Sequence, residues 1–250
     1  MDFSSPDLDA SIEFYGSLLG WEVPETETSQ QTGGYRQAMK DGKPVAGMMP
    51  KMDADTPTAW SSYISVADAD ATTAKVKEAG GQVIAEPMDV LDLGRMAVYT
   101  DTGGAFFGVW QPKSFIGAQL VNEPGGFAWN ELNTRDFAGA KEFYGSVFGW
   151  DFDESTPGDE PYAMIVVDGS PVGGVLDLEA RNVPAEIPPH WQVYFGVEDT
   201  DATIAAAKER GGGVMLEPVE IPFGRFAILT DPHGGSFAVI ALNEMARENA

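Results

Sequence analysis

The chain has 250 residues, 43% of them hydrophobic, so it can bury one large core or two cores of about 120 residues each. It contains no cysteine, which excludes disulfides, thiolate metal sites and cysteine nucleophiles. With 39 acidic and 15 basic residues its net charge is −24, which disfavours nucleic acid and anionic membranes as partners. Because it shows neither a membrane-spanning apolar run nor a signal peptide, we expect a cytoplasmic protein.

One helical motif occurs twice, at residues 7–21 and again at residues 136–150. Both copies keep the core Glu-Phe-Tyr-Gly-Ser, and both close with Gly-Trp. Apolar residues recur at helical spacing, which predicts an amphipathic helix in each copy. Aspartates at the start (Asp7, Asp136) suit the N-cap, and the closing glycines (Gly20, Gly149) suit the left-handed position that ends a helix.

The rest of the chain repeats as well. Residues 60–87 return as residues 191–218, and residues 94–107 return as residues 224–237. We therefore expect two homologous domains, 1–115 and 116–250, divided within the Pro- and Gly-containing stretch at residues 111–126.

A second repeat lies inside each half. Aspartate pairs at Asp68 and Asp70, and at Asp199 and Asp201, again open helices that end in glycine, and we expect them to act as caps. Short strand-like runs follow each helix. The repeating unit is therefore βαβββ, four times over, with paired units forming a curved mixed sheet that has its helices outside.

The aspartate-led helix with Phe-Tyr, and the Thr-Asp-Pro-x-Gly turn at residues 230–234, resemble those of a known family. The chain is similar over nearly its whole length to the vicinal oxygen chelate superfamily (glyoxalase, bleomycin resistance protein, extradiol dioxygenase), and most of all to two-domain members from actinobacteria. The resemblance implies an α+β fold of tandem domains, in which four βαβββ units form cups with the helices outside. Many members of the family hold a divalent metal in the cup.

The residues at the family's metal positions do not suit a metal. The resemblance places the ligands of the second half at Trp129, near Gly174, at Gln192 and at Ala238. The corresponding residues of the first half lie near Gly47 and at Ser61 and Gly108, and the first position precedes Met1. Only Gln192 could coordinate a divalent ion, which needs three or four ligands, so we expect no metal and no cofactor. A new site built from His190 and His233 with Asp231 or Glu131 is the less favoured alternative.

Strand alternation predicts the lining of the cup in the second half. Its ligand-binding candidates are Trp129, Asn133, Gln192, Tyr194, Arg225 and Ala238. Its catalytic candidates are Glu131 and His190, because a carboxylate or an imidazole can act as a general base. Two structural readings stay open: His190 can cap backbone groups at a strand start, and Arg225 can make the same structural pairing as its repeat partner Arg95.

The first half offers a poorer lining. Its expected inward residues are Asp2, Ser4, Ser61, Tyr63, Ser65, Phe106, Gly108 and Trp110. Its opening strand is short, so either this half has decayed or the sequence begins inside its first strand. We therefore expect the working cup in the second half. Each half can complete its own cup, or the two halves can complete each other's; either way one chain suffices, which predicts a monomer.

Three functions fit these observations. The first is a metal-free small-molecule binding protein of the bleomycin-resistance type, with an aromatic or polyketide-like ligand. The second is a metal-independent lyase, isomerase or hydroxylase-like enzyme that uses Glu131 or His190 as base. The third is a non-catalytic accessory or regulatory protein whose acidic surface meets a basic partner. The missing metal ligands favour the first.

Overall fold

The computed structural model describes residues 1–54, 56–155, 161–244 and 246. It confirms the α+β class and the fourfold strand–helix–strand repeat, and we number the repeats as modules 1 to 4. Module 1 contains β1 (Asp2–Ser5), α1 (Leu8–Leu19), α2 (Glu27–Gln31), β2 (Arg36–Lys40) and β3 (Lys43–Pro50). Module 2 contains β4 (Ala59–Ser61), β5 (Tyr63–Ser65), α3 (Ala69–Glu78), β6 (Gln82–Val90), β7 (Gly94–Thr100) and β8 (Phe106–Pro112).

The second half repeats this order with longer opening strands. Module 3 contains β9 (Phe127–Thr134), α4 (Phe137–Phe148), β10 (Asp151–Asp153), β11 (Tyr162–Val167) and β12 (Ser170–Asp177). Module 4 contains β13 (His190–Gly196), α5 (Thr200–Glu209), β14 (Gly213–Ile221), β15 (Gly224–Thr230) and β16 (Ser236–Leu242). Module 1 departs from the pattern, because the strand expected after α1 is reduced to an isolated bridge between Glu22 and Met39.

The helix boundaries follow the predicted caps. The side chains of Asp7, Asp68, Asp136 and Asp199 each accept a hydrogen bond from the backbone N–H three residues later. Helices α1 and α4 end at Gly20 and Gly149, whose φ angles of 70° and 72° lie in the left-handed region.

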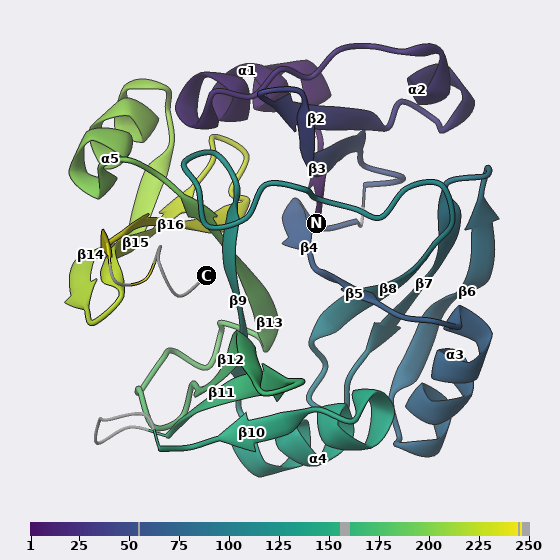
Figure 1. The fold of residues 1–250 in the computed structure, drawn as a ribbon. Helices are drawn as coiled ribbons and strands as arrows, with labels where there is room; N and C mark the ends of the chain where they lie inside the picture. Colours follow the sequence, from purple (N-terminus) through teal and green to yellow (C-terminus); the bar gives the residue numbers. More distant parts are fainter. Residues whose placement is uncertain (55, 156–160, 245, 247–250) are drawn as a thin grey trace. The chain divides into compact units, whose positions relative to one another are not determined.

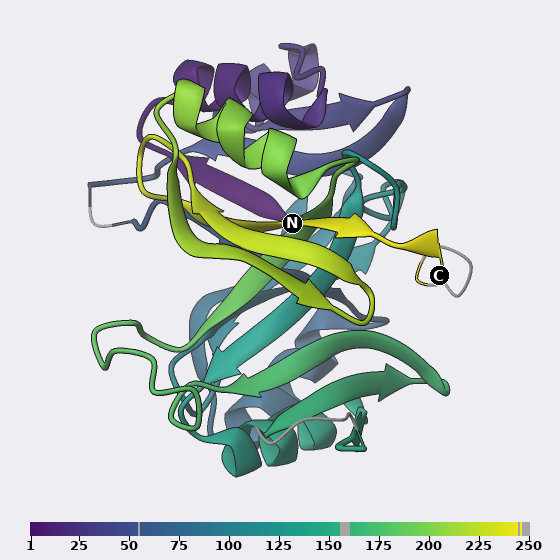
Figure 2. The same cartoon turned by 90° about the vertical axis from the view of Figure 1, so that its left-hand side faces the viewer.

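The chain divides into two compact units that interleave in sequence. Unit 1 comprises residues 1–61, 117–128 and 193–250, and unit 2 comprises residues 62–116 and 129–192. Unit 1 therefore combines module 1 with β4 and most of module 4, and unit 2 combines the rest of module 2 with most of module 3 and the first residues of β13. Figures 1 and 2 show α1 beside α5 in unit 1, although these helices come from opposite ends of the chain.

A buried tyrosine in the repeated helical motif joins the two modules of each unit. In unit 1 the Tyr15 hydroxyl donates to Asp231 (3.4 Å) and accepts from the Trp60 indole (3.1 Å). In unit 2 the Tyr144 hydroxyl donates to Asp101 (3.1 Å) and accepts from the Trp191 indole (2.9 Å). Each network lies in its own aromatic-rich core, so the residues that define the sequence repeat are the ones that hold the modules together.

Each unit has mixed sheets with two distinct faces. The strands form three sheets, in the orders β2-β3-β1-β4, β10-β11-β12-β9-β13-β16-β15-β14 and β5-β8-β7-β6. One face of these strands packs against the helices and forms the core, and we call it the helix face. The opposite side, which corresponds to the predicted cup interior, we call the open face. Successive residues of a strand alternate between these two faces.

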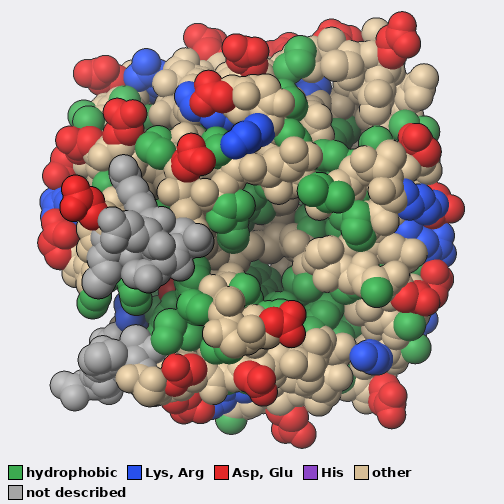
Figure 3. All heavy atoms as spheres, viewed as in Figure 1, with side chains coloured by type: hydrophobic (Ala, Val, Ile, Leu, Met, Phe, Trp, Pro, Cys, Tyr) green, Lys and Arg blue, Asp and Glu red, His purple; other side chains and the backbone are tan. Residues whose placement is uncertain are grey.

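The described residues contain no helix long and apolar enough to cross a membrane. Acidic side chains are scattered over the side of the molecule shown in Figure 3 and do not gather into one patch there.

Candidate functional site

Strand β9 places the main candidate residues on the open face of unit 2. Leu132 is fully buried in the core on the helix face. Its neighbours Glu131 and Asn133 therefore lie on the open face, as does Trp129. Glu131 is 9% exposed and Asn133 is 8% exposed, so both are polar groups in a sheltered position. The amide of Asn133 donates to the backbone carbonyl of Glu131 at 3.4 Å.

The sequence analysis missed Tyr162, which lies at the centre of this group. Its hydroxyl accepts a hydrogen bond from the Trp129 indole (3.2 Å) and donates one to the Glu131 carboxylate. Gly174 lies opposite Glu131 in the register of β12 and β9. A Cβ at Gly174 would overlap the Tyr162 hydroxyl, so the phenol requires glycine there. We call Trp129, Glu131 and Tyr162 the unit 2 triad.

The triad has a definite protonation pattern. Burial raises the pKa of the Tyr162 phenol well above its usual value, and the neighbouring Glu131 carboxylate raises it further. The Trp129 hydrogen bond and the charge of Arg181 act in the opposite direction. The phenol is therefore protonated at neutral pH and remains a hydrogen-bond donor to Glu131.

The second sheet of unit 2 has an apolar open wall of its own, on the other side of the shared core from the triad. Tyr63 lies opposite Gly108 in the pairing of β5 with β8, and a Cβ at Gly108 would overlap the Tyr63 ring. Further open-face residues follow from the register of β6, β7 and β8: Met88, Met96, Val98, Phe106 and Trp110. Met88 is 53% exposed and Phe106 is 54% exposed, so part of this wall is open to solvent.

Tyr63 and Trp129, which were expected in different cups, both belong to unit 2. They lie on open faces that are on opposite sides of its core, because the helix faces of both sheets pack in the same cluster.

His190 and Gln192 also belong to unit 2, at the start of β13. Nδ1 of His190 lies 2.8 Å from the carbonyl oxygen of Pro188, and the Gln192 side chain is a second partner. Burial lowers the pKa of His190, so the imidazole is neutral at pH 7. Since a carbonyl oxygen only accepts a hydrogen bond, Nδ1 carries the proton. His190 therefore binds a backbone group at the start of a strand, which is the structural role that the sequence had left open.

The remaining predicted residues belong to unit 1, so the lining expected for the second half is divided between the units. Tyr194 lies beside Ala238 in the pairing of β13 with β16, and its ring lies 5.7 Å from that of Phe226. Arg225 lies on the helix face, where it binds Asp201 through two hydrogen bonds of 3.0 Å. Arg95 binds Asp70 in the same way in unit 2, which indicates a repeated structural ion pair.

Unit 1 repeats the core of the triad. The Tyr35 hydroxyl donates to Asp2 at 3.0 Å, and a Cβ at Gly47 would overlap both side chains. Asp2 lies opposite Gly47 in the register of β1 and β3, as Glu131 lies opposite Gly174 in unit 2. Tyr162 opens β11 and Tyr35 directly precedes β2, and each of these strands pairs with the glycine-bearing strand. In both units the tyrosine lies 12 residues before its glycine. This repeated spacing was the signal in the sequence that could have identified both tyrosines.

The residues at the family's metal positions do not fit a metal ion. Trp129 and Gly174 supply no ligand atom from their side chains, and the Tyr162 ring lies over Gly174. His190 and Glu131 belong to unit 2, whereas His233 and Asp231 belong to unit 1. Within the described part of the chain no three His, Cys, Asp or Glu residues form a group that could hold a metal.

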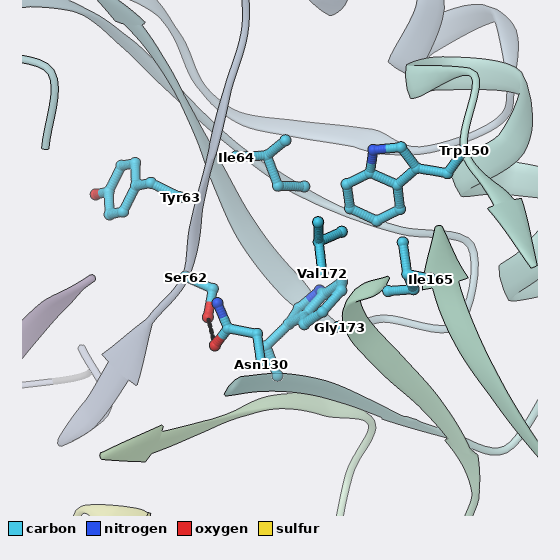
Figure 4. Close-up of a pocket in the computed structure, with 9 residues that line it drawn as sticks. Ser62, Tyr63, Ile64, Asn130, Trp150, Ile165, Val172 and Gly173 are labelled. Carbon is cyan, nitrogen blue, oxygen red and sulfur yellow. Dashed lines mark hydrogen bonds between the residues drawn. The ribbon is translucent and has the colours of Figure 1, made fainter. Parts of the chain in front are cut away.

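A separate hollow of about 200 Å³ lies in unit 2, and Figure 4 shows its lining. Trp150, Ile165 and Val172 point toward one another there, while Tyr63 points away from them. Ile165 belongs to the buried core, so the hollow borders the helix face. The polar pair in its wall is self-satisfied, because Ser62 Oγ and Asn130 Oδ1 are hydrogen-bonded at 2.9 Å. The hollow is therefore a packing gap and not part of the triad.

Comparisons with known proteins identify the family. The model of the Glyoxalase/Bleomycin resistance protein/Dioxygenase superfamily matches residues 2–109 and 126–239. The anthracycline biosynthesis protein DnrV of Streptomyces peucetius is 38% identical, over 97% of this chain and 92% of that protein. CFP32 of Mycobacterium tuberculosis, provisionally named a glyoxylase, is 39% identical over 96% of this chain and 92% of its own length.

Solved structures share the fold at low sequence identity. The Mn(II)-bound glyoxalase from Novosphingobium aromaticivorans has a TM-score of 0.64 at 18% identity, covering 96% of this chain and 80% of its own. The 2,2',3-trihydroxybiphenyl 1,2-dioxygenase of Sphingomonas wittichii strain RW1 has a TM-score of 0.65 at 16% identity, covering 96% and 88%. These likenesses concern the fold alone.

Proposed function

Because the chain belongs to the Glyoxalase/Bleomycin resistance protein/Dioxygenase superfamily, we propose that it is a metal-independent binding protein for a planar aromatic, polyketide-like small molecule. The observation that carries this proposal is the unit 2 triad. Where a metal-dependent relative would need ligands, this chain has Trp129, and a tyrosine lies over Gly174. The cup has exchanged its metal positions for aromatic surface and a buried carboxylate.

The chemistry of the open face fits such a ligand. Trp129, which is partly exposed, offers a ring face for stacking, which contributes about 0.5–1.5 kcal/mol per ring pair beyond the buried area. Glu131 can accept a hydrogen bond from a ligand hydroxyl. The name of the relative DnrV, an anthracycline biosynthesis protein, supports a polycyclic aromatic ligand of this kind.

We further propose that one chain is sufficient for binding. Each unit already contains two modules, joined by the buried network around Tyr15 or Tyr144. A second copy is therefore not needed to complete a cup, and small molecules, not nucleic acid or membranes, are the expected partners.

The test is calorimetric titration with 1,4-dihydroxyanthraquinone, a planar polycyclic phenol. Trp129→Ala should weaken binding at least tenfold, because it removes a stacking surface and the hydrogen bond to Tyr162. Glu131→Gln should weaken it about tenfold, because the charged acceptor is lost. Phe223→Ala is the matched control, since Phe223 is a 46% exposed aromatic residue of unit 1 outside the triad.

Two results would contradict the proposal. The first is parent-like affinity in both triad variants. The second is a requirement for added Mn²⁺, Fe²⁺, Ni²⁺ or Zn²⁺ before the compound binds.

A second candidate function is a metal-independent lyase or isomerase of the same superfamily. The observation that favours it is the Glu131–Tyr162 pair, which sets a sheltered carboxylate base beside a phenol that stays protonated at neutral pH. Chromatography of the compound after incubation separates the two functions. Binding alone returns it unchanged, whereas catalysis converts it at a rate that Glu131→Gln abolishes.

A further inference from the structure

We propose that the packing gap of unit 2, the hollow in Figure 4, binds an uncharged molecule with a single aromatic ring. The inference comes from a comparison of the two units, which repeat the same order of strands and helices. Unit 1 fills the equivalent part of its core with an aromatic side chain. Unit 2 has the hollow there, so a ligand can supply the ring that its own sequence lacks.

Two tryptophans that line the hollow have the same arrangement in both units. In unit 2 the rings of Trp150 and Trp191 lie 6.3 Å apart at an angle of 84°. In unit 1 their repeat partners, Trp21 and Trp60, lie 6.0 Å apart at an angle of 80°. Unit 1 therefore reproduces the frame of the hollow, and the side chains that pack against the two tryptophan pairs can be compared directly.

The side chain beside the tryptophan pair differs between the units. Phe195 of unit 1 follows Ile64 of unit 2 by 131 residues, which is also the spacing between the matched tryptophans of β4 and β13. The Phe195 ring is fully buried and packs edge-on against both tryptophans of unit 1, at 5.2 Å and 4.9 Å. Ile64 lines the hollow and is only partly buried. The aliphatic side chain therefore leaves space that a phenyl ring fills in unit 1.

The size and the wall of the hollow suit one uncharged ring. Its volume is about 200 Å³, and an apolar cavity of about 150 Å³ is large enough to admit benzene. Protein interiors contain few voids larger than a water molecule, so a hollow of this size is unusual. The residues that line it carry no charge, and its polar pair, Ser62 and Asn130, is bonded internally. A charged ligand would lose its hydration there without gaining a partner, so the ligand should be uncharged.

Val172 marks the entrance to the hollow. Its side chain points toward Ile165 and is 43% exposed, so the hollow reaches the surface there. Val45 takes the same place in unit 1, two residues before Gly47, but is fully buried. Unit 2 is therefore open where unit 1 is closed, and a small molecule can enter without unfolding of the core.

The experiment is titration of fluorobenzene, followed by its fluorine NMR resonance. The parent should saturate at one molecule per chain. Ile64→Phe supplies the ring that unit 1 already has, so it should weaken binding about tenfold or more and raise the melting temperature by filling the hollow. Val172→Phe should block the hollow from its exposed side and weaken binding to the same extent. Val219→Phe, the same change at a 39% exposed valine of unit 1, is the matched control and should bind as the parent does.

Three results would overturn the proposal. The first is no binding of fluorobenzene by the parent. The second is binding at the parent's strength in Val172→Phe, which decides alone if Ile64→Phe does not fold. The third is loss of binding in Trp129→Ala, which would place the compound at the unit 2 triad.

A second titration keeps this site distinct from the function proposed for the triad. Val172→Phe should bind 1,4-dihydroxyanthraquinone as the parent does, and Trp129→Ala should bind fluorobenzene as the parent does. If Val172→Phe weakens both compounds equally, the hollow is not a separate site and the inference fails. If only the anthraquinone fails to bind the parent, the triad function is wrong and the hollow site stands.

Discussion

Replacing Tyr144 by phenylalanine tests whether the buried networks hold the paired modules together. The change leaves the Trp191 indole N–H buried without its acceptor, which costs about 1–3 kcal/mol. Asp101 also loses one donor but keeps the backbone N–H groups of Gly103 and Ala105, both at 2.9 Å. We therefore expect Tyr144→Phe to lower the free energy of unfolding by about 2–4 kcal/mol.

The same change in unit 1 should cost less. The Tyr15 hydroxyl lies 3.4 Å from Asp231, near the outer limit of a hydrogen bond, and 3.1 Å from the Trp60 indole. We expect Tyr15→Phe to lower the free energy of unfolding by about 1–2 kcal/mol. Urea unfolding followed by tryptophan fluorescence and circular dichroism measures both variants against the parent.

The loss of unfolding free energy in Tyr144→Phe should also depend on pH. Burial raises the folded-state pKa of Asp101 above its ordinary 3.8, and the Tyr144 hydrogen bond opposes that rise. Without the phenol this pKa rises further, so the variant loses stability relative to the parent as pH rises through the folded-state values. The deficit should be larger at pH 7.5 than at pH 4.5. A loss below 1 kcal/mol, or a larger loss in Tyr15→Phe, would refute the reasoning.

Three further expectations follow from the structure. Purified protein should hold well under one equivalent of divalent metal, and EDTA should leave its melting temperature unchanged; a stoichiometric metal whose removal lowers that temperature would contradict this. Sedimentation should give a monomer across micromolar concentrations, because each unit is completed within one chain; an obligate dimer would count against it. Since burial lowers the pKa of His190, its unfolded form takes up the proton more readily, and the parent should lose stability relative to His190→Gln as pH falls from 7.5 to 5.5. If the melting temperatures of the parent and of His190→Gln fall equally with pH, His190 is not desolvated.

Local features of the fold could be predicted from the sequence because they depend on neighbouring residues. The caps at Asp7 and Asp136 and the stops at Gly20 and Gly149 were confirmed, since cap and glycine chemistry acts within one helical turn. Alternation along β9 also held, with Leu132 in the core.

The pairing of modules could not be predicted, because the repeat makes the possible partners nearly equivalent. Tyr15 could bond Asp101 as well as Asp231 on sequence grounds, since both aspartates follow a threonine and precede a turn. Only the packing of whole modules decides between them.

The role of Tyr162 was hidden for a different reason. The family resemblance marked Gly174 only as the position of a missing metal ligand. A glycine alone does not reveal which side chain lies over it. That depends on the register of β11 and β12, which shifts between Ile165 and Val166. Such an irregularity changes the side chain's position without leaving a mark in the hydrophobic pattern.

The interleaving of the units has a consequence for synthesis on the ribosome. Unit 2 is bracketed by residues 62 and 192, so it can close while the last segment of the chain is still being made. Unit 1 must wait, because Tyr15 meets a partner 216 residues later, at Asp231. Until then, the apolar side of α1 lacks the module 4 residues against which it packs, and it is the surface that a chaperone would encounter first. Slow translation of the codons for residues 193–250 would lengthen this exposure, so the yield of soluble protein should respond more to codon choice there than elsewhere in the gene.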